Sequence, residues 1–339
     1  MTPTVTISFD LELAWGSFDH RYGKDLLDCA RWTHDYAVSS ILSHLSETQL
    51  SATWAIVGLV MLDRFPPLEH YQEVHYPHFP KPWFCWVPKE RGEAEAPEWL
   101  GGSLLRAIRA AQPAQEVGFH AFSHVIFGSP GTPRERVQQE LRSCMDIARQ
   151  LGLDAKAFVF PRNSVAYLDE LRQAGFRCFR SLDHLPWRPL PIPKGRAIAS
   201  VLADFLGVTP RTVLPCLQNG LVEIPGSLMI RHAQGWRKLI PDACRLRRLR
   251  QGLRQVVDKG GIFHVWLHPE NLYYERPRIE NVLVEFFHEV ASAVTQGKVR
   301  CLTMGQVAEE FLVHSKQGVD PGRLPSDQHR GGLPLEPSS

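Results

Sequence analysis

The chain has 339 residues, 44% hydrophobic and 22% charged, a composition that is ordinary for a packed core and excludes an intrinsically disordered protein. Lys and Arg together number 38 against 36 Asp and Glu, so the net charge of +2 gives no global field that would favour nucleic acid as a partner. The seven cysteines are scattered, odd in number and without a C-x-x-C pair, which argues against a disulfide framework and a cysteine zinc site and suits a reducing compartment.

The chain carries no recognisable targeting or membrane segment. Its first ten residues lack the basic and apolar regions of a signal peptide, and its longest apolar run, 53–62, is too short to cross a bilayer. We therefore predict a soluble protein of the cytoplasm.

Segments typical of strands alternate with segments typical of helices. Helical periodicity predicts helices over 26–45, 134–151 and 277–295, the second of them introduced by Pro133. A strand–helix alternation repeated seven or eight times predicts an α/β fold in which parallel strands close into a barrel. The predicted strands are short apolar or β-branched runs over 4–9, 52–58, 116–119, 157–161, 177–180, 221–225, 261–268 and 299–304.

Two regions interrupt this alternation. Residues 66–97 are rich in Pro, His and aromatic side chains, and we expect a long irregular insertion, either a binding loop or a self-packed surface loop. Trp83 and Trp86 within it are candidate substrate-binding residues. Residues 314–339 are rich in Gly, Pro, Ser and charge and are expected to be disordered. Residues 1–313 then form a single domain.

Asp10 and Glu12 come at the end of the first predicted strand, in the sequence S-F-D-L-E-L. Residues two apart in an extended chain point to the same face, so we expect the two carboxylates side by side. Two like charges at that distance are costly unless a cation or a shared proton compensates them. The alternative is a solvated strand end without a further role.

His120 and His124 lie four residues apart in G-F-H-A-F-S-H. If a helix begins there, both imidazoles share one face and can bind one metal ion, although a chance pair is the alternative in a chain with 15 histidines. Ala121 stands where the H-E-x-x-H motif requires Glu, so this is not that motif. With Asp10 and Glu12, the pair predicts a catalytic zinc set of two histidines and one carboxylate, which leaves the second carboxylate as a base on bound water.

Two further clusters follow predicted strands. In F-P-R-N, Arg162 can orient a carboxylate through a bidentate contact, the alternative being an ordinary surface arginine, and the neighbouring Asn163 is a candidate substrate-binding residue. In H-V-W-L-H-P-E-N, His268 is a candidate general acid, whereas His264 is expected to be a buried core histidine. All four clusters fall where strands end, and in a barrel those ends converge on one mouth.

Residues 229–254 contain eight Lys and Arg residues and one acid, and Leu246, Leu249 and Leu253 recur in them at helical spacing. A basic amphipathic helix can lie on an anionic membrane surface, which would place the protein at the inner membrane face with a lipid-linked or phosphorylated sugar as its substrate. The alternative is an outer barrel helix whose leucines pack on the core.

The motifs S-F-D-L-E, G-F-H-A-F-S-H, F-P-R-N and W-L-H-P follow one another in this order between Val5 and Phe311. The series resembles that of the polysaccharide deacetylases, the NodB-homology group of carbohydrate esterase family 4. The resemblance implies a distorted (β/α) barrel of about seven parallel strands and metal-dependent removal of an acyl group, in the first instance N-acetyl. The implied substrate is an acylated amino sugar, an oligosaccharide or a lipid-linked saccharide, and the implied cofactor is a divalent ion with zinc as the leading candidate.

The resemblance also implies roles for individual residues. Asp10 matches the catalytic base, and His268 matches the acid that protonates the leaving amine. Arg162 belongs to the arginine motif, although it follows Pro161 whereas the family arginine usually precedes the proline. Asp183, in S-L-D-H-L-P-W, is a candidate supporting carboxylate. The matches to the metal ligands are Glu12, His120 and His124.

The spaced acidic pair D-x-E differs from the two adjacent aspartates of the usual first motif. It resembles a branch that includes peptidoglycan deacetylase-like and allantoinase-like members. Two alternatives therefore stay open, namely hydrolysis of another C–N amide by an allantoinase-like or deformylase-like enzyme, and a non-catalytic saccharide-binding relative.

Overall fold

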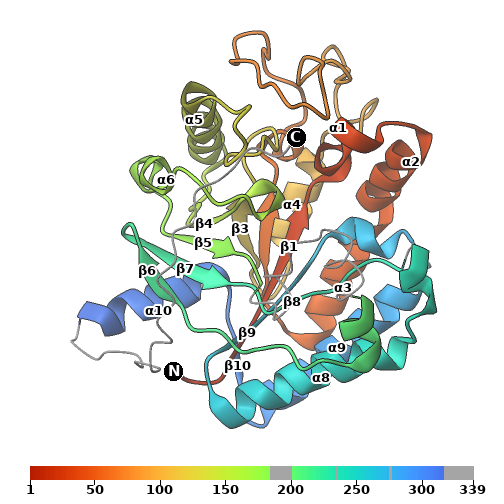
Figure 1. Ribbon diagram of the computed structural model, residues 1–339, viewed down its shortest axis with the longest axis vertical. Helices are drawn as coiled ribbons and strands as arrows, with labels where there is room; N and C mark the ends of the chain where they lie inside the picture. Colours follow the sequence, from red (N-terminus) through yellow and green to blue (C-terminus); the bar gives the residue numbers. More distant parts are fainter. Residues whose placement is uncertain (184–200, 234, 275–276, 317–339) are drawn as a thin grey trace.

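The computed structural model describes residues 1–183, 201–233, 235–274 and 277–316. A curved sheet lies at the centre of the molecule, and helices cover its outer side (Figure 1). The strand order is β6-β7-β5-β4-β3-β2-β1-β9-β8, with β10 paired beside β1, and every pairing is parallel except that of β6 with β7.

β1 (Thr4–Leu11) is the third strand from the β8 end of the sheet and is buried along its whole length, as expected for a strand covered on both faces. Its long parallel neighbours are β2 (Thr53–Ile56) and β9 (Ile262–Leu267). Each predicted strand has a counterpart in the sheet. Five further strands are β3 (Glu116–Phe119), β4 (Ala157–Val159), β5 (Cys178–Ser181), β6 (Cys216–Gln218) and β10 (Arg300–Cys301).

One extended stretch closes the sheet. β7 (Leu221–Pro225) pairs with β5, and β8 (Leu228–Met229), which follows after two residues, pairs with β9. Gly226 lies between them, where a Cβ atom would approach Asp183 Oδ1 to 2.0 Å, so only glycine fits this position. The prediction of a distorted barrel built on about seven parallel strands is therefore confirmed.

The helices predicted from periodicity are present. α2 (Lys24–Trp32) continues through a π-helical turn into α3 (Val38–Thr48), and α5 (Arg134–Leu151) ends at Gly152, whose φ of +61° is the left-handed cap that glycine favours. The last of them is α9 (Arg278–Thr295). Further helices are α1 (Phe18–Arg21), α4 (Gly102–Ala110), α6 (Leu168–Ala174), α8 (Asp242–Lys259) and α10 (Met304–Lys316), and residues 201–206 are also helical.

Residues 242–254 of the basic segment belong to α8, but the leucines of this helix do not face outward. Leu246, Leu249 and Leu253 are buried in the core, so the leucine stripe cannot contact a membrane. The interpretation as an outer barrel helix holds for α8, because the stripe is the face that packs on the barrel.

The insertion 66–97 packs on itself. It contains no helix or strand in this described part of the chain, yet Tyr76, Trp83 and Phe84 are buried and belong to the main hydrophobic cluster. Edge-to-face contacts join Trp83 to Tyr76 and to Phe18 of α1. The aromatic composition therefore serves mainly to anchor the loop on the barrel.

The prediction that disorder begins at His314 is wrong for residues 314–316. α10 extends to Lys316 because Phe311 and Leu312 pack against the second hydrophobic cluster of the barrel, so residues 314–316 are helical. Residues 317–339 lie outside the described residues. Among the helices that are described, none combines the length and the apolar character that a membrane crossing requires.

Candidate active site

A pocket of about 360 Å³ lies at the carboxyl ends of β1, β3, β4 and β9, where barrel folds place their chemistry. All four motif clusters contribute to its wall. Its lining includes the ionisable residues Asp10, Glu12, His120, His124, His268 and Glu270.

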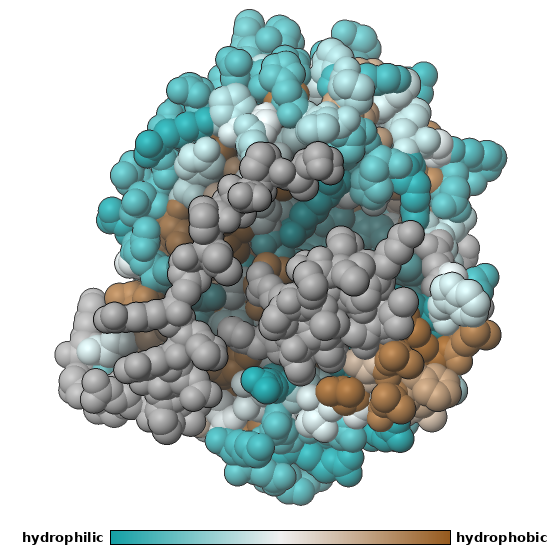
Figure 2. All heavy atoms as spheres, in the orientation of Figure 1, coloured by the Kyte–Doolittle hydropathy of each residue, from teal (hydrophilic) through white to brown (hydrophobic). Residues whose placement is uncertain are grey.

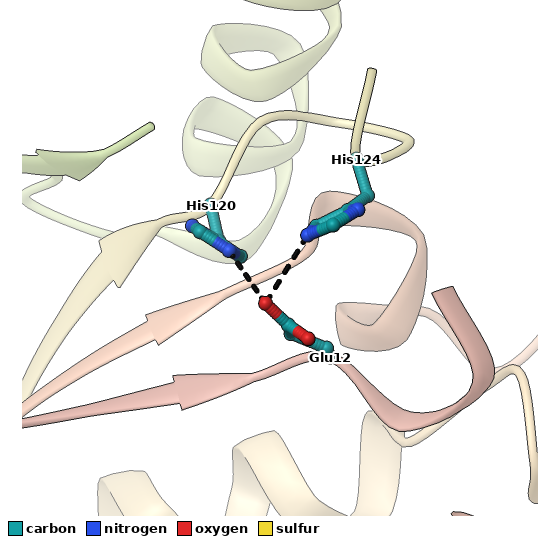
Figure 3. Close-up of side chains that lie close together, drawn as sticks. All are labelled: Glu12, His120 and His124. Atoms are coloured by element: carbon teal, nitrogen blue, oxygen red, sulfur yellow. Dashed lines mark hydrogen bonds and ion pairs between the residues drawn. The ribbon is translucent and has the colours of Figure 1, made fainter. Parts of the chain in front are cut away.

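Glu12, His120 and His124 form the most compact group in the pocket. Figure 3 shows both imidazoles directed at the carboxylate of Glu12, whose Oε1 lies 2.9 Å from His120 Nε2 and 3.1 Å from His124 Nε2. His120 Nδ1–H donates to the carbonyl of Val159 at 2.8 Å, which leaves the Nε2 lone pair directed at the group. Both histidines are buried, and burial lowers the pKa of His124, which favours the neutral imidazole.

The two histidines converge through a turn and not through a helix. His120 follows β3 directly, and the chain then turns through Ala121 and His124, whose φ angles are +58° and +62°. A spacing of four residues brings the rings together here because the turn reverses the chain. The expectation of a shared helix face is therefore wrong, although the expected pairing is right.

A buried ion pair of α5 braces this turn. Glu140 Oε2 accepts hydrogen bonds from the backbone N–H groups of Phe122 and Ser123 at 3.0 and 2.7 Å, and Glu140 Oε1 accepts one from Arg136 Nε at 3.0 Å. Neither charged side chain is exposed. The sequence analysis did not single out this pair, although two opposite charges four residues apart on one helix are a recognisable signal.

The donor set fits a divalent metal ion. One carboxylate and two imidazole nitrogens are ligands typical of zinc. The distances of 2.9 and 3.1 Å from Glu12 Oε1 approach the separation of about 3.3 Å between ligand atoms in a tetrahedral site with bonds of about 2.0–2.1 Å. Asp10, Glu12 and His268 form a second cluster of potential ligand atoms that shares Glu12 with the first.

Arg180 of β5 holds Asp10. Its Nη1 and Nη2 donate to the two carboxylate oxygens at 2.7 and 2.5 Å, and both side chains are buried. Burial alone would raise the pKa of Asp10, but the charge of Arg180 and its hydrogen bonds to the carboxylate keep it below its usual value. Sequence reasoning missed Arg180, whose signal is an arginine inside an otherwise apolar strand.

Arg162 lines the pocket but has a different carboxylate as its partner. Its Nη2 donates to both oxygens of Asp19 at 2.6 Å, and the buried Asp19 also binds His20 and His78. A bidentate role towards Asp10, which Arg180 already fills, is therefore not available to Arg162. Asn163 lines the pocket as well, and its Oδ1 accepts a long hydrogen bond of 3.3 Å from Arg180.

His268 lies beside both carboxylates. Its Nε2 is 3.3 Å from Glu12 Oε1 and 3.8 Å from Asp10 Oδ2. Burial alone would lower the pKa of His268, but the charges of Glu12 and Asp10 raise it to about 9. His264 is a core histidine as expected, since its Nε2 lies 2.9 Å from Ser8 Oγ and its side chain is fully buried.

Glu270 is a third carboxylate of the pocket that sequence reasoning missed, although it lies in the same H-P-E-N stretch as His268. Its Oε1 accepts hydrogen bonds from the backbone N–H groups of Leu13 at 2.6 Å and Glu12 at 3.2 Å. Its Oε2 is buried and has no hydrogen-bond partner. Burial and the nearby charge of Glu12 raise the pKa of Glu270 to about 8.

Several residues around the pocket have strained backbones. Leu13, Ala121, His124, Arg162 and Asn163 all have φ angles between +50° and +62°, in the left-handed region that residues with side chains seldom adopt. Such outliers persist only where surrounding contacts hold them, and they concentrate at functional sites.

Asp183, Trp83 and Trp86 lie outside the pocket. Asp183 accepts a hydrogen bond of 2.8 Å from Trp266 Nε1, and the ring of Trp266 stacks on the guanidinium of Arg180, so Asp183 is linked to the site through these two residues. Trp83 is buried and its indole N–H donates to the carbonyl of Ser123. Trp86 stacks on Tyr22, away from the pocket wall. The burial of Trp83 speaks against its direct contact with a substrate, whereas the role of Trp86 in substrate binding stays a prediction.

Comparison with known proteins finds similar structures but no similar sequence among family models or curated proteins. The sequence matches no protein-family model and no curated protein. A structure described as a polysaccharide deacetylase from Mycobacterium smegmatis shares 17% identity with a TM-score of 0.60, over 96% of this chain and 94% of that one. Another described in the same way, from Pseudomonas aeruginosa PAO1, shares 10% identity with a TM-score of 0.59, over 94% and 92% of the two chains.

A third similar structure is that of Puue allantoinase, at 11% identity and a TM-score of 0.58, over 94% of this chain and 92% of the allantoinase. At such low sequence identities the similarity is one of fold, that is, of the arrangement of strands and helices along nearly the whole length of each chain. The chain therefore has the fold of these polysaccharide deacetylases and of this allantoinase.

Proposed function

We propose that the protein is a metal-dependent hydrolase that removes an acyl group, in the first instance N-acetyl, from an amino-sugar-containing glycan or glycolipid. The observation that carries the proposal is the convergence of three groups in one pocket. These groups are the Glu12–His120–His124 cluster, the Asp10–Arg180 pair and His268. Amide hydrolysis needs an activated water, a base and an acid for the leaving amine, and each of these tasks has a candidate residue here.

Glu12, His120 and His124 would hold the divalent ion, with zinc as the first choice. Such an ion, when bound, polarises a carbonyl group and lowers the pKa of water. The protein's share is to orient the three ligands, which it does through the Val159 carbonyl behind His120 and the Glu270 carboxylate behind the Glu12 backbone.

Asp10 is the proposed base. The two hydrogen bonds from Arg180 keep its carboxylate ionised and fix its orientation, and the remaining lone pairs can accept one proton from the attacking water. The water oxygen then bonds to the amide carbon. A buried partner such as Arg180 supplies the fixed geometry that a proton transfer requires.

His268 is the proposed acid. Its Nε2–H, on the pocket side and 3.3 Å from Glu12 Oε1, donates a proton to the amide nitrogen as the carbon–nitrogen bond breaks. This step is needed because an amide does not expel an unprotonated amine. The products are a carboxylic acid, acetate for an N-acetyl group, and a free amino sugar.

The decisive experiment combines metal analysis with acetate release. The purified protein should contain close to one equivalent of zinc or a similar ion, which His120→Ala/His124→Ala should lack. The wild type should release acetate from a member of a panel of N-acetylated mono- and oligosaccharides. A protein that neither contains nor takes up metal would overturn the proposed mechanism.

A second candidate is hydrolysis of another C–N amide, favoured by the spaced acidic pair and by the likeness to Puue allantoinase. Adding allantoin and N-formylated amino sugars to the panel separates the two candidates. We further infer cytoplasmic residence, which the seven unpaired cysteines support. A non-catalytic saccharide-binding protein would bind sugars without releasing acetate or any other acid.

A further inference from the structure

Two short segments beside α8 carry their apolar side chains outward. In the helical segment 201–206, Leu202, Phe205 and Leu206 are 51%, 52% and 67% exposed, whereas Asp204 is buried. Soluble helices normally show the opposite arrangement, with the acid outside and the leucines inside. The inversion indicates that the outer side of this segment meets an apolar environment.

The 3-10 helix η5 (Gly235–Leu239) has the same inverted pattern. Trp236 and Leu239 are 79% and 67% exposed, the highest values, together with that of Leu206, among the large apolar side chains that the structure describes. Arg237 between them is only partly exposed and lies 3.8 Å from the buried Asp204. Two separate stretches of sequence therefore turn charge inward and apolar surface outward.

Contacts through α8 hold the two segments on the same side of the molecule. Asp204 binds Arg248 of α8 as well as Arg237 of η5, and Arg247 Nη2 donates to the carbonyl of Phe205 at 3.3 Å. Figure 2 shows a hydrophobic area at the lower right, on the side where Figure 1 places α8 and α9. We name the group Leu202, Phe205, Leu206, Trp236 and Leu239 the docking face.

The charges around the docking face are positive. Residues 201–211 and 235–250 contain two acids, Asp204 and Asp242, and both bind arginines of the protein. Lys238 and Arg247 are exposed beside the apolar side chains. An apolar surface bordered by cations is complementary to an anionic lipid layer, into which Trp, Phe and Leu insert while Lys and Arg meet the headgroups.

We propose that the docking face binds the protein peripherally to an anionic lipid surface. The face is continuous in sequence with the pocket, since His232 lines the pocket and Trp236 follows four residues later. A substrate carried on a lipid would then reach the pocket from the same surface, an inference that rests on the proposed deacylation. The contact itself does not depend on the reaction.

The test is sedimentation of the full-length protein with vesicles of phosphatidylglycerol and phosphatidylcholine, beside vesicles of phosphatidylcholine alone. The wild type should bind the anionic vesicles, and added salt should weaken binding because the cations contribute. Trp236→Ser/Leu239→Ser and Lys238→Glu/Arg247→Glu should each reduce the affinity at least tenfold. Arg250, which pairs with Glu285 and Glu289, is not part of the charge variant.

Matched controls change other exposed residues elsewhere. Leu217→Ser/Val313→Ser removes two exposed apolar side chains, and Lys89→Glu/Lys298→Glu reverses two exposed cations. Both controls should bind vesicles like the wild type. Thermal unfolding and metal content should be unchanged in all variants, which separates a failure of this proposal from a failure of the proposed function.

Three results would overturn the proposal. The first is a wild type that does not bind anionic vesicles, and the second is unchanged binding by the docking-face variants. The third is a wild-type dimer in light scattering that Trp236→Ser/Leu239→Ser converts to a monomer, without vesicle binding by either. In that case the face is an interface between two copies of the chain.

Discussion

Arg180 and Asp10 face each other across the barrel interior, joined by two hydrogen bonds of 2.7 and 2.5 Å and excluded from solvent. The guanidinium also stacks on Trp266, 4.0 Å from the ring centroid. A buried pair of this kind contributes little net stability, yet removal of one partner strands the other charge in the interior.

Arg180→Met should therefore lower the free energy of unfolding by about 3–5 kcal/mol at neutral pH, measured by urea denaturation. Arg162→Met is the matched control. It should lose clearly less, because Arg162 is partly exposed and Asp19 keeps His20 and His78 as partners. Equal losses in the two variants would contradict the distinct roles assigned to these arginines.

Asp10→Asn should reduce turnover roughly 10²–10⁴-fold, because the amide cannot accept the proton from water. Metal content should stay at the wild-type level, since Asp10 is not among the three proposed ligands. The control is Asp183→Asn, which keeps an acceptor for Trp266 and should retain most activity. If the wild type and both variants bound saccharide equally well and none of them turned it over, the protein would be a binding protein.

Glu270→Ala should weaken metal binding about 10–100-fold, the usual effect of losing a group that orients a ligand. The reason is that the backbone N–H groups of Glu12 and Leu13 lose their acceptor. Glu270→Gln keeps an acceptor oxygen and should bind metal more tightly than the alanine variant. Competition with a chromogenic chelator gives the dissociation constants, and identical values for the two variants would rule out positioning through these hydrogen bonds.

His264 should make the protein sensitive to mild acid. Burial, together with the charge of Arg180, lowers the pKa of His264 to about 3, whereas an unfolded histidine titrates near 6.5. Below pH 6.5 the unfolded state binds the proton first, so stability should fall between pH 6.5 and pH 3 by up to about 1.4 kcal/mol per pH unit.

The measurement is urea unfolding of wild type and His264→Gln at several values between pH 7.5 and pH 4. The glutamine variant should start from a lower stability, because it changes the contacts with Ser8 and the Pro225 carbonyl. Its stability should nevertheless decline less steeply towards acid. Parallel curves for the two proteins would show that His264 is not the responsible group.

The strand ends were predictable because parallel strands buried on both faces leave runs of apolar residues that stop abruptly at Asp10, His120 and His268. The partner of Asp10 was not predictable, because Arg180 contacts Asp10 across the barrel interior and does not lie on a neighbouring strand. Periodicity locates a strand but does not state what lies opposite it once the sheet has closed.

The geometry of His120 and His124 shows a second limit. A spacing of four residues fits a helix, but it also fits a turn held in left-handed conformations by the carboxylate of Glu140. The choice between them depends on a buried acid of α5, eighteen and seventeen residues further along the chain from Phe122 and Ser123. Local pattern alone does not contain that information.

The position of β1 also sets the order in which the pocket can be completed during synthesis. Glu12, His120 and His124 all belong to the first 124 residues and can come together once β1, β2 and β3 have paired. β1 also pairs with β9 and β10, which come much later in the sequence, and the bond between Ser8 and His264 spans 256 residues. The ribosome therefore synthesises the proposed metal ligands long before His268 and Glu270. In the nascent chain, the edge of β1 that pairs with β9 stays unpaired until the last quarter of the sequence is made.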